Sequence, residues 1–406
     1  MIEWERPENQ NIVYSVFLVV VRILFFAMDL LITKNSYTAN SNFNCNGIGP
    51  IDWIGCKLMW LTNLMVCEGI KVGKRIQIGQ KWQEGSLANE VGIRMLRVVL
   101  VISLLWSIVP FCVGGCMRLF ASLFKRDFIF LHPQGYEKKS IDSLTICTFN
   151  TALMPSVGSV VNGVPPPEDR VQKIVREILS KGDQIVCLQE CFDATYSQKL
   201  VDGLANTYPY IIHHVGPSNF GFGSGLTLAS KVPISAAQFV QFNDSAGDEI
   251  FANKGCLAVT LDVGSGRHVN LMTTHLQADV SSADASVIRK KQIEQMARVA
   301  KLYQKRHPAL CFLVCGDFNI PPHSGQDWEC LDRNVQLLSS TSSTLWEVDD
   351  LWRDDDPKNW ERQESMQVDH IGVFCEISGK AFPLCSDADA MDGSSDHLAV
   401  RGKINF

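Results

Sequence analysis

Several short apolar runs in the second half of the chain end in a polar side chain that can do chemistry. Asn150, Glu190 and His275 come at or just past the end of such a run, and so do Asp317 and Asn319. Residues just beyond strands commonly line a cleft. Carboxylate and amide oxygens are the ligands that Mg²⁺ prefers, and an imidazole changes charge near neutral pH. The pattern therefore predicts a site for metal-assisted and acid-base chemistry.

Two further polar groups come just before apolar runs. Asp369 precedes the run that starts at His370, and Ser395, Asp396 and His397 precede the last run of the chain. Taken singly, an Asp or Asn beside a strand is usually a turn residue, and an isolated His is more often structural than catalytic. The joint order of all these residues favours an active site.

This ordered set resembles the signature of the endonuclease/exonuclease/phosphatase superfamily, and the resemblance covers nearly all of Ile141 to Phe406. Three further stretches resemble the neutral sphingomyelinases: Cys187 to Asp193, Phe251 to Gly255 and Thr274 to Ala278. The apolar segments ahead of them are similar to those of the membrane-attached type. The resemblance implies a Mg²⁺-dependent phosphodiesterase of the phospholipase C type, with Mn²⁺ as a substitute ion. It would hydrolyse sphingomyelin to ceramide and phosphocholine without a covalent intermediate.

The resemblance and the demands of phosphodiester cleavage together imply a role for each residue. Glu190 is expected to bind the metal directly, Asn150 to supply another oxygen or to contact the phosphate, and Asp396 to hold the metal or its waters. His397 is expected to take a proton from the attacking water, while Asp369 fixes its tautomer and stabilises its protonated form.

A second group is expected on the opposite side of the phosphorus atom. His275 would donate to a phosphate oxygen, Asp317 would orient a water or the leaving group, and Asn319 would contact the phosphate. Lys254 resembles the phosphate or substrate contact of the family. In that family an Asp five residues before this Lys contacts it in a switch. Glu249 stands at that spacing here, so a regulatory switch between Glu249 and Lys254 stays open.

The elements that must position these residues are many short strands with few helices between them. This pattern predicts an α/β fold in which a two-sheet β-sandwich is flanked by helices, and the resemblance implies the DNase I-like version of it. Periodicity predicts three helices, Arg170–Leu179, Ser197–Ala205 and Val287–Arg306. The expected strands are Leu144–Phe149, Gln184–Leu188, Gly225–Ala229, Cys256–Val263, His268–Thr274, Ala309–Cys315, His370–Phe374 and Leu398–Ile404.

The chain is expected to have three parts: a membrane-associated hydrophobic region over residues 1–126, a linker over 127–140 and a catalytic domain over 141–406. In the first part, Ile12 to Thr33 is long enough to span a bilayer, and a helix that lies within a protein bundle or at the membrane interface is the equal alternative. These N-terminal hydrophobic membrane helices would precede the sandwich.

Two later apolar stretches leave the membrane topology open. Ile51 to Ile70 is a weaker spanning segment, because it contains charged residues. Val98 to Met117 contains Pro110 and the pair Gly114-Gly115, which favour a break or a bend and so leave a re-entrant hairpin as the alternative to a full span. Lysines and arginines between and after these stretches favour the cytoplasmic side and contact with anionic phospholipids.

Charge divides the chain into two halves. Up to Ser140 there are 15 basic and 10 acidic residues, whereas 22 basic and 33 acidic residues follow it. Many of the 14 cysteines lie in apolar runs, which predicts buried free thiols, a reducing compartment and a catalytic domain that faces the cytosol. No nucleic-acid partner is expected, because nucleic-acid binders usually display basic patches.

Three alternatives keep parts of this interpretation. The same fold could hydrolyse another phospholipid or a phosphoinositide, because the site residues do not select a head group. A nuclease and an inactive membrane scaffold are less favoured, the first by charge and the second by the presence of every polar site residue. The oligomeric state is left open.

Overall fold

The computed structural model describes most of the second half of the chain and a few helical residues of the first half. The described residues are 54, 55, 58, 62, 98, 101, 105–117, 120, 127–133, 140–155, 164–216, 223–278, 284–323, 325–337, 367–374, 384–389, 391 and 394–405. Internal contacts divide the chain into two units, Met1–Phe124 and Lys125–Phe406, which we describe separately.

The first unit contains a helix whose apolar side chains are exposed. Residues 105–117 are helical throughout, so the backbone continues as a helix past Pro110 and the pair Gly114-Gly115. Trp106 is 70% exposed and Val109 63% exposed. In the described part of the chain, no helix has both the length and the apolar character needed to cross a membrane. Ile12 to Thr33 lies outside the described residues, so the predicted membrane helices remain a prediction.

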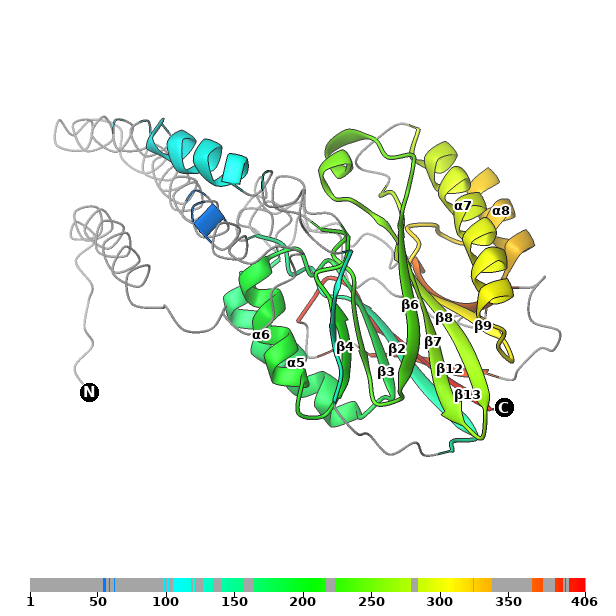
Figure 1. The fold of residues 1–406 in the computed structure, drawn as a ribbon. Coiled ribbons are helices and arrows are strands. Elements are labelled where there is room, and N and C mark those ends of the chain that lie inside the picture. Colours follow the sequence, from blue (N-terminus) through cyan, green and yellow to red (C-terminus); the bar gives the residue numbers. More distant parts are fainter. Residues whose placement is uncertain are drawn as a thin grey trace, which may run out of the picture. The chain divides into compact units, whose positions relative to one another are not determined.

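The second unit is built from two mixed β-sheets (Figure 1). The seven-stranded sheet has the order β1 (Ile129–Leu131), β4 (Tyr210–His213), β5 (Thr227–Ser230), β3 (Ile185–Gln189), β2 (Ser143–Asn150), β13 (Ala399–Asn405) and β12 (Leu384–Asp389). The six-stranded sheet has the order β10 (Val335–Leu337), β11 (Asp369–Phe374), β9 (Phe312–Asp317), β8 (Arg267–His275), β7 (Gly255–Gly264) and β6 (Ile234–Gln241).

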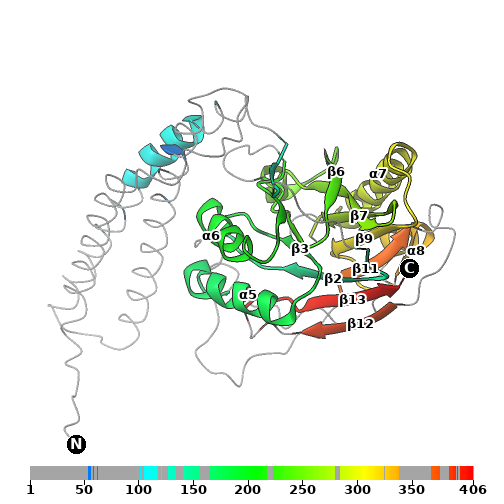
Figure 2. The same ribbon diagram turned by 60° about the horizontal axis from the view of Figure 1, so that its bottom comes forward.

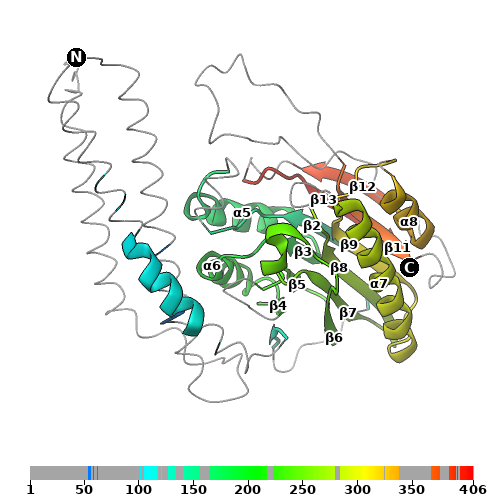
Figure 3. The same cartoon turned by 90° about the horizontal axis from the view of Figure 1, so that it is seen from above.

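Helices cover the outer face of each sheet (Figures 2 and 3). The helices α5 (Pro167–Lys181) and α6 (Ala194–Leu204) share a buried cluster with β2 and β3, and α7 (Ala285–Arg306) and α8 (Gln326–Asn334) share another with β8 and β9. A third cluster fills the space between the sheets. Every residue of β7 is buried, because its sheet is covered on both faces. The predicted sandwich flanked by helices is confirmed.

Local sequence signals fix the helices next to the site. The helix α5 starts at Pro167, has two acidic residues in its first turn and ends at Lys181. The next residue, Gly182, has a φ of 72° and forms a left-handed cap. The helix α6 starts after Asp193, whose side chain accepts hydrogen bonds from the backbone N–H groups of Thr195 and Tyr196. Asp193 belongs to one of the sphingomyelinase-like stretches, and its contacts there are those of a helix cap.

All eight predicted strands and all three predicted helices are present, with ends that differ by a few residues. The sequence analysis missed β1, β4, β6, β10, β12, α8 and a 3-10 helix, Gly247–Phe251. Short edge strands such as β1 carry too few residues for a period-2 pattern to stand out. β1 lies inside the stretch expected to be a linker, yet it pairs with β4. Each cysteine that the structure describes is free. Seven of them are buried, as predicted, whereas Cys112 and Cys116 are exposed.

Strand pairing places the site residues at one edge of the sandwich. β2 and β3 are parallel, with Asn150 beside Gln189, and β8 and β9 are parallel, with His275 beside Asp317. β11 runs antiparallel to β9, so its first residue, Asp369, also lies beside Asp317. Strand ends that are far apart in the sequence thus meet at one place.

Candidate active site

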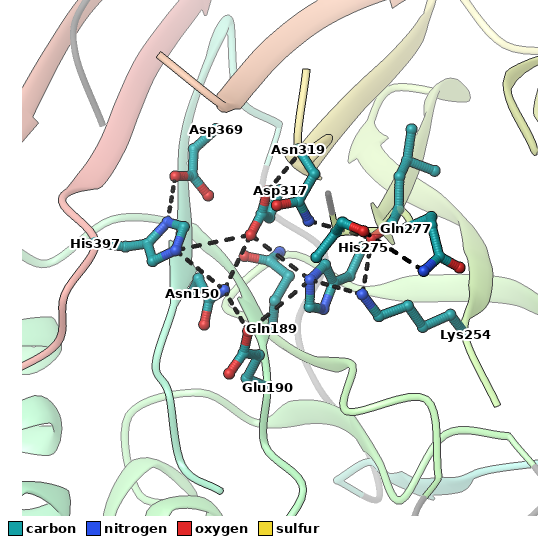
Figure 4. Close-up of polar contacts among 12 residues, drawn as sticks. Asn150, Gln189, Glu190, Lys254, His275, Gln277, Asp317, Asn319, Asp369 and His397 are labelled. Carbon is teal, nitrogen blue, oxygen red and sulfur yellow. Dashed lines mark hydrogen bonds and ion pairs between the residues drawn. The ribbon is translucent and has the colours of Figure 1, made fainter. Parts of the chain in front are cut away.

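Three side chains from other segments converge on the amide nitrogen of Asn150 (Figure 4). Its Nδ2 atom donates to Oε1 of Glu190 at 2.9 Å and to Oδ2 of Asp317 at 3.0 Å. Nε2 of His397 lies 3.5 Å from the same nitrogen. Asn150 is fully buried. The structure therefore brings together residues that the sequence analysis assigned to both sides of the phosphate.

After each of two strands, β3 and β9, one residue adopts a left-handed backbone conformation, which residues other than glycine disfavour. Glu190 has a φ of 56° and Asn319 has a φ of 52°, both in the left-handed region. Such strain persists only where surrounding contacts hold it, and it clusters at functional sites. Gly316 precedes Asp317 with a φ of 146°, and a Cβ atom there would lie 2.0 Å from the backbone oxygen of Thr274. Only glycine allows β8 and β9 to approach this closely under the site.

Glu190 and Asp317 form a desolvated acidic pair. Burial raises the pKa of Glu190 to about 7, and the negative charge of Asp396 adds to this rise. Burial also raises the pKa of Asp317 to about 6, with Asp369 adding to it. Ligand atoms of Glu190, Asp317 and His275 lie within 4.8 Å of one another. A divalent cation would offset the charge of both acids, so the donor set fits Mg²⁺, which prefers oxygen ligands.

The amide of Asn150 is oriented away from the role of metal ligand. Its Oδ1 atom accepts a hydrogen bond from the backbone N–H of Ala152 at 3.0 Å, which turns Nδ2 toward Glu190 and Asp317. An N–H group donates and offers no lone pair to a metal. This arrangement agrees with the alternative in which Asn150 contacts the phosphate, because the Nδ2 amino group faces the site.

His397 and Asp369 form the expected pair. Nδ1 of His397 lies 2.7 Å from Oδ2 of Asp369, and Nε2 faces the site, 3.9 Å from Oδ2 of Asp317. Burial by itself lowers the pKa of His397. The charge and hydrogen bond of Asp369, together with Asp317 and Asp396, outweigh burial and raise this pKa well above 6.5. The structure thus places the predicted base and its orienting acid in contact.

His275 lies on the other side of the acidic pair, beside a buried lysine. Nζ of Lys254 lies 3.0 Å from Nε2 of His275 and 2.7 Å from the backbone oxygen of Leu276. Lys254 also forms a 2.5 Å ion pair with Oε1 of Glu249. Burial and the positive charges of Lys254 and His397 lower the pKa of His275 well below 6.5. The imidazole is therefore neutral, and Glu249 occupies the partner position that the sequence analysis left open.

Asn319 and Asp396 take more peripheral positions. Nδ2 of Asn319 donates to the backbone oxygen of Leu276 at 3.2 Å, and its backbone N–H donates to Oδ1 of Asp317 at 2.9 Å. Oδ1 of Asp396 lies 3.1 Å from Oγ of Ser395. Neither group of candidate metal ligands among the described residues contains Asp396. Its contact with the site is electrostatic, through its effect on the pKa values of Glu190 and His397.

The sequence analysis missed Arg170, a buried arginine behind the site. Arg170, Ile174 and Ile178 are spaced by four residues on α5, and all three are buried. That spacing places the arginine on the apolar face of the helix, which is the signal that could have identified it. A charged residue on a buried face normally has a specific set of partners.

Comparison with known proteins supports the resemblance seen in the sequence. A model described as the Endonuclease/Exonuclease/phosphatase family matches residues 147–397. A sphingomyelin phosphodiesterase 5 of Danio rerio is 32% identical over 163 residues, which cover 35% of this chain and 29% of that protein. The chain therefore matches less than a third of the length of this relative.

Two solved structures share the fold. Sphingomyelinase C from Streptomyces griseocarneus superposes with a TM-score of 0.51 and 24% identity, covering 65% of this chain and 100% of that one. The beta toxin from Staphylococcus aureus, in a double mutant with bound magnesium ions, gives a TM-score of 0.50 and 18% identity, covering 64% of this chain and 99% of that one. At these identities the likeness concerns the fold.

Proposed function

Because this chain belongs to the endonuclease/exonuclease/phosphatase family, we propose that its second unit is a phosphodiesterase that hydrolyses sphingomyelin to ceramide and phosphocholine. The observation that carries the proposal is the pair His397–Asp369, which faces the acidic pair Glu190–Asp317 across Asn150. A general base and a cation site that both lie beside one buried amide are suited to the attack of water on a phosphodiester. The choice of sphingomyelin rests on the three motif stretches and on the relatives named for that substrate.

His397 would act as the general base. Its Nε2 atom faces the acidic pair, and the 2.7 Å contact with Asp369 orients the ring and stabilises it once it is protonated. The attacking water would give a proton to Nε2 while its oxygen bonds to phosphorus. The bond between phosphorus and the ceramide oxygen breaks, and that oxygen takes up a proton from the solvent.

Mg²⁺ is the proposed cofactor, held by Glu190 and Asp317. Bound there, it would neutralise charge on the phosphate and offset the charge of Asp317, which helps to raise the pKa of His397. The raised pKa values of Glu190 and Asp317 support a cation site, since both acids are desolvated without one. The beta toxin that shares this fold holds magnesium ions, which agrees with this choice.

Lys254 and His275 would bind the phosphate oxygens. The ammonium of Lys254 can only donate, so in the described state Nε2 of His275 accepts and the ring proton lies on Nδ1. Donation from His275 to phosphate requires the proton on Nε2. Lys254 can release its hydrogen bond to Nε2, so that the ring proton moves there, while it keeps its contacts with Glu249 and the backbone oxygen of Leu276. A neutral imidazole beside a fixed ammonium would then stabilise developing negative charge.

The first unit is proposed to hold the enzyme at a membrane, with the catalytic unit on the cytosolic side and anionic phospholipids beside the basic residues. The exposed apolar side chains of the helix at 105–117 support an apolar environment for that unit, because exposed apolar patches commonly mark interaction surfaces. Protease digestion of sealed vesicles tests the orientation. In sealed vesicles whose cytosolic face is outward, protease should cleave the second unit without detergent. Cleavage only after the vesicles are opened would contradict the cytosolic placement.

A lipid panel tests the activity. Purified full-length protein in mixed micelles should release phosphocholine from sphingomyelin in a Mg²⁺-dependent manner, and His397→Ala should abolish this release. His268→Gln is the matched control, because His268 lies at the opposite end of β8 from His275. Release from phosphatidylcholine or a phosphoinositide, with none from sphingomyelin, would transfer the proposal to that lipid. Cleavage of DNA with no release from any lipid would contradict the proposed function.

A further inference from the structure

Arg170 is almost completely buried, with 2% of its surface exposed, although no carboxylate of the described residues forms a hydrogen bond with it. Its guanidinium instead donates to four main-chain oxygens. Nε donates to Pro165 at 2.6 Å, Nη1 to Thr151 at 2.8 Å and to Ser394 at 2.7 Å, and Nη2 to Ala152 at 2.6 Å. These oxygens belong to three separate segments of the chain, so one side chain ties three segments together.

Two of the three segments carry the site. Thr151 and Ala152 directly follow Asn150, and Ser394 precedes Asp396 and His397. We propose that Arg170 is a positioning residue of the active site, which fixes the distance between Asn150 and His397 by clamping the backbone on either side of them. This inference rests on the proposed function, because it assigns a part in that reaction.

The turn after Asn150 shows why a clamp is needed there. Ala152 has a φ of 47°, a left-handed conformation that costs a non-glycine residue about 1 kcal/mol or more. Its N–H donates to Oδ1 of Asn150, and its oxygen accepts from Arg170. The same turn therefore sets the orientation of the Asn150 amide, and Arg170 holds that turn in place.

A second link shows that the two segments form one unit. Oγ of Ser395 donates to the backbone oxygen of Asn150 at 2.7 Å, and it accepts from the backbone N–H of His397 at 3.2 Å. Ser395 thus joins Asn150 to His397 directly. Arg170 joins the two residues that follow Asn150 to Ser394, which precedes Ser395. Nδ2 of Asn150 lies 3.5 Å from Nε2 of His397, so a small shift of either segment would change the geometry of the base.

The charge of Arg170 adds to this role. Burial lowers the pKa of Arg170 to about 10, while Asp396 and Glu190 act in the opposite direction. The guanidinium stays charged at neutral pH, and its charge lies near the acids that surround the site. A neutral side chain of the same size would lose both the four hydrogen bonds and this charge.

Two substitutions of Arg170 and one control test the inference. Arg170→Lys keeps the charge but can satisfy fewer carbonyls, and Arg170→Met removes both. The control is Arg401→Lys, because Arg401 is a partly buried arginine on β13 that pairs with Asp183, just before β3 begins. That pair lies at the end of β3 opposite Glu190. Each protein is compared in full length by thermal unfolding with and without Mg²⁺ and by kinetics with sphingomyelin.

The inference expects both Arg170 variants to lose function beyond their loss of stability. kcat should fall about 10- to 100-fold in Arg170→Lys and further in Arg170→Met, while KM for sphingomyelin changes less than about threefold. The Mg²⁺ concentration for half-maximal activity should rise, and the Mg²⁺-induced increase in melting temperature should shrink. Arg401→Lys should lower the melting temperature and leave kcat and the response to Mg²⁺ unchanged.

Each other outcome has a definite meaning. Arg170 variants that unfold at lower temperature but keep the kcat and Mg²⁺ response of the wild type would overturn the inference. Failure of both variants to fold, while Arg401→Lys folds, would also overturn it and make Arg170 a determinant of the fold alone. If the wild type releases no phosphocholine, the proposed function fails, and the Mg²⁺-induced change in melting temperature still decides whether Arg170 organises the site.

Discussion

Nδ1 of His397 lies 2.7 Å from Oδ2 of Asp369; Asp369 is the first residue of β11, and His397 lies in the segment before β13. The contact leaves Nε2 as the only ring nitrogen of His397 that faces the acidic pair. It also makes the state of the base depend on a fully buried carboxylate.

Asp369→Asn should lower activity and move its pH dependence. Asp369 helps to raise the pKa of His397, so its loss lowers that pKa. The base is active when unprotonated, so the acidic limb of the kcat/KM profile should move to lower pH. The maximum should fall by about 100-fold or more, because the ring loses its orienting partner. Kinetics across the pH range measure both effects, with the exposed Asp332→Asn on α8 as the control. An unmoved acidic limb would remove Asp369 from its role.

Glu190→Gln should abolish activity yet stabilise the metal-free protein at neutral and alkaline pH. The pKa of Glu190 is about 7 in the fold, whereas the ordinary pKa of a glutamate carboxyl is 4.5. The carboxyl of Glu190 thus holds its proton more tightly in the folded state than in the unfolded chain. As the pH rises, ionising this carboxyl in the fold therefore lowers the free energy of unfolding. That cost is about 3 kcal/mol at full effect, and Gln avoids it.

Urea unfolding at several pH values measures this stabilisation. The gain from Glu190→Gln should be absent below pH 4.5, should grow as the pH rises and should be complete above the folded pKa of about 7. Saturating Mg²⁺ should reverse the order, because the cation stabilises only the wild type. Glu294→Gln, an exposed change on α7, is the control. A gain that does not vary with pH would contradict the assigned pKa.

Gly316→Ala should destabilise the fold and disrupt Asp317. The added Cβ would lie 2.0 Å from the oxygen of Thr274, so β8 and β9 must separate where His275 and Asp317 pair. We expect a loss of about 3 kcal/mol or more in the free energy of unfolding. Gly266→Ala is the matched control, since its φ of +73° is also left-handed but nothing lies within 4 Å of its Cβ position. Equal stability losses for the two variants would show that the close approach is unimportant.

Lys254→Met should weaken catalysis and raise the pKa of His275. The ammonium contributes to the low pKa of this imidazole, after burial, and it lies 3.0 Å from Nε2. Removal should lower kcat/KM by about 100-fold, because a charge that stabilises the transition state is lost. Histidine proton resonances followed by NMR would report the change in pKa, and the exposed Lys301→Met on α7 is the control. Retained activity with an unchanged His275 pKa would exclude both roles.

The sequence by itself determined the strands that carry the site and the residues at their ends. Asn150, Glu190, His275 and Asp317 could be named because each breaks an apolar run, and a strand must end where its apolar pattern ends. The buried runs of β7, β8 and β9 were equally clear for the same reason. Short or edge elements such as β1 and β12 were missed, since their pairing depends on neighbours that are distant in the sequence.

Only the tertiary structure decided how those residues meet. The orientation of the Asn150 amide follows from the turn at Ala152, and Asp396 lies outside both candidate ligand groups of the described residues. Arg170 acquires its partners from three segments that no local pattern connects. Spacing along a chain reports which face or end of an element a side chain occupies. Hydrogen bonds between elements depend on strand order and register, which arise only when the two sheets pack.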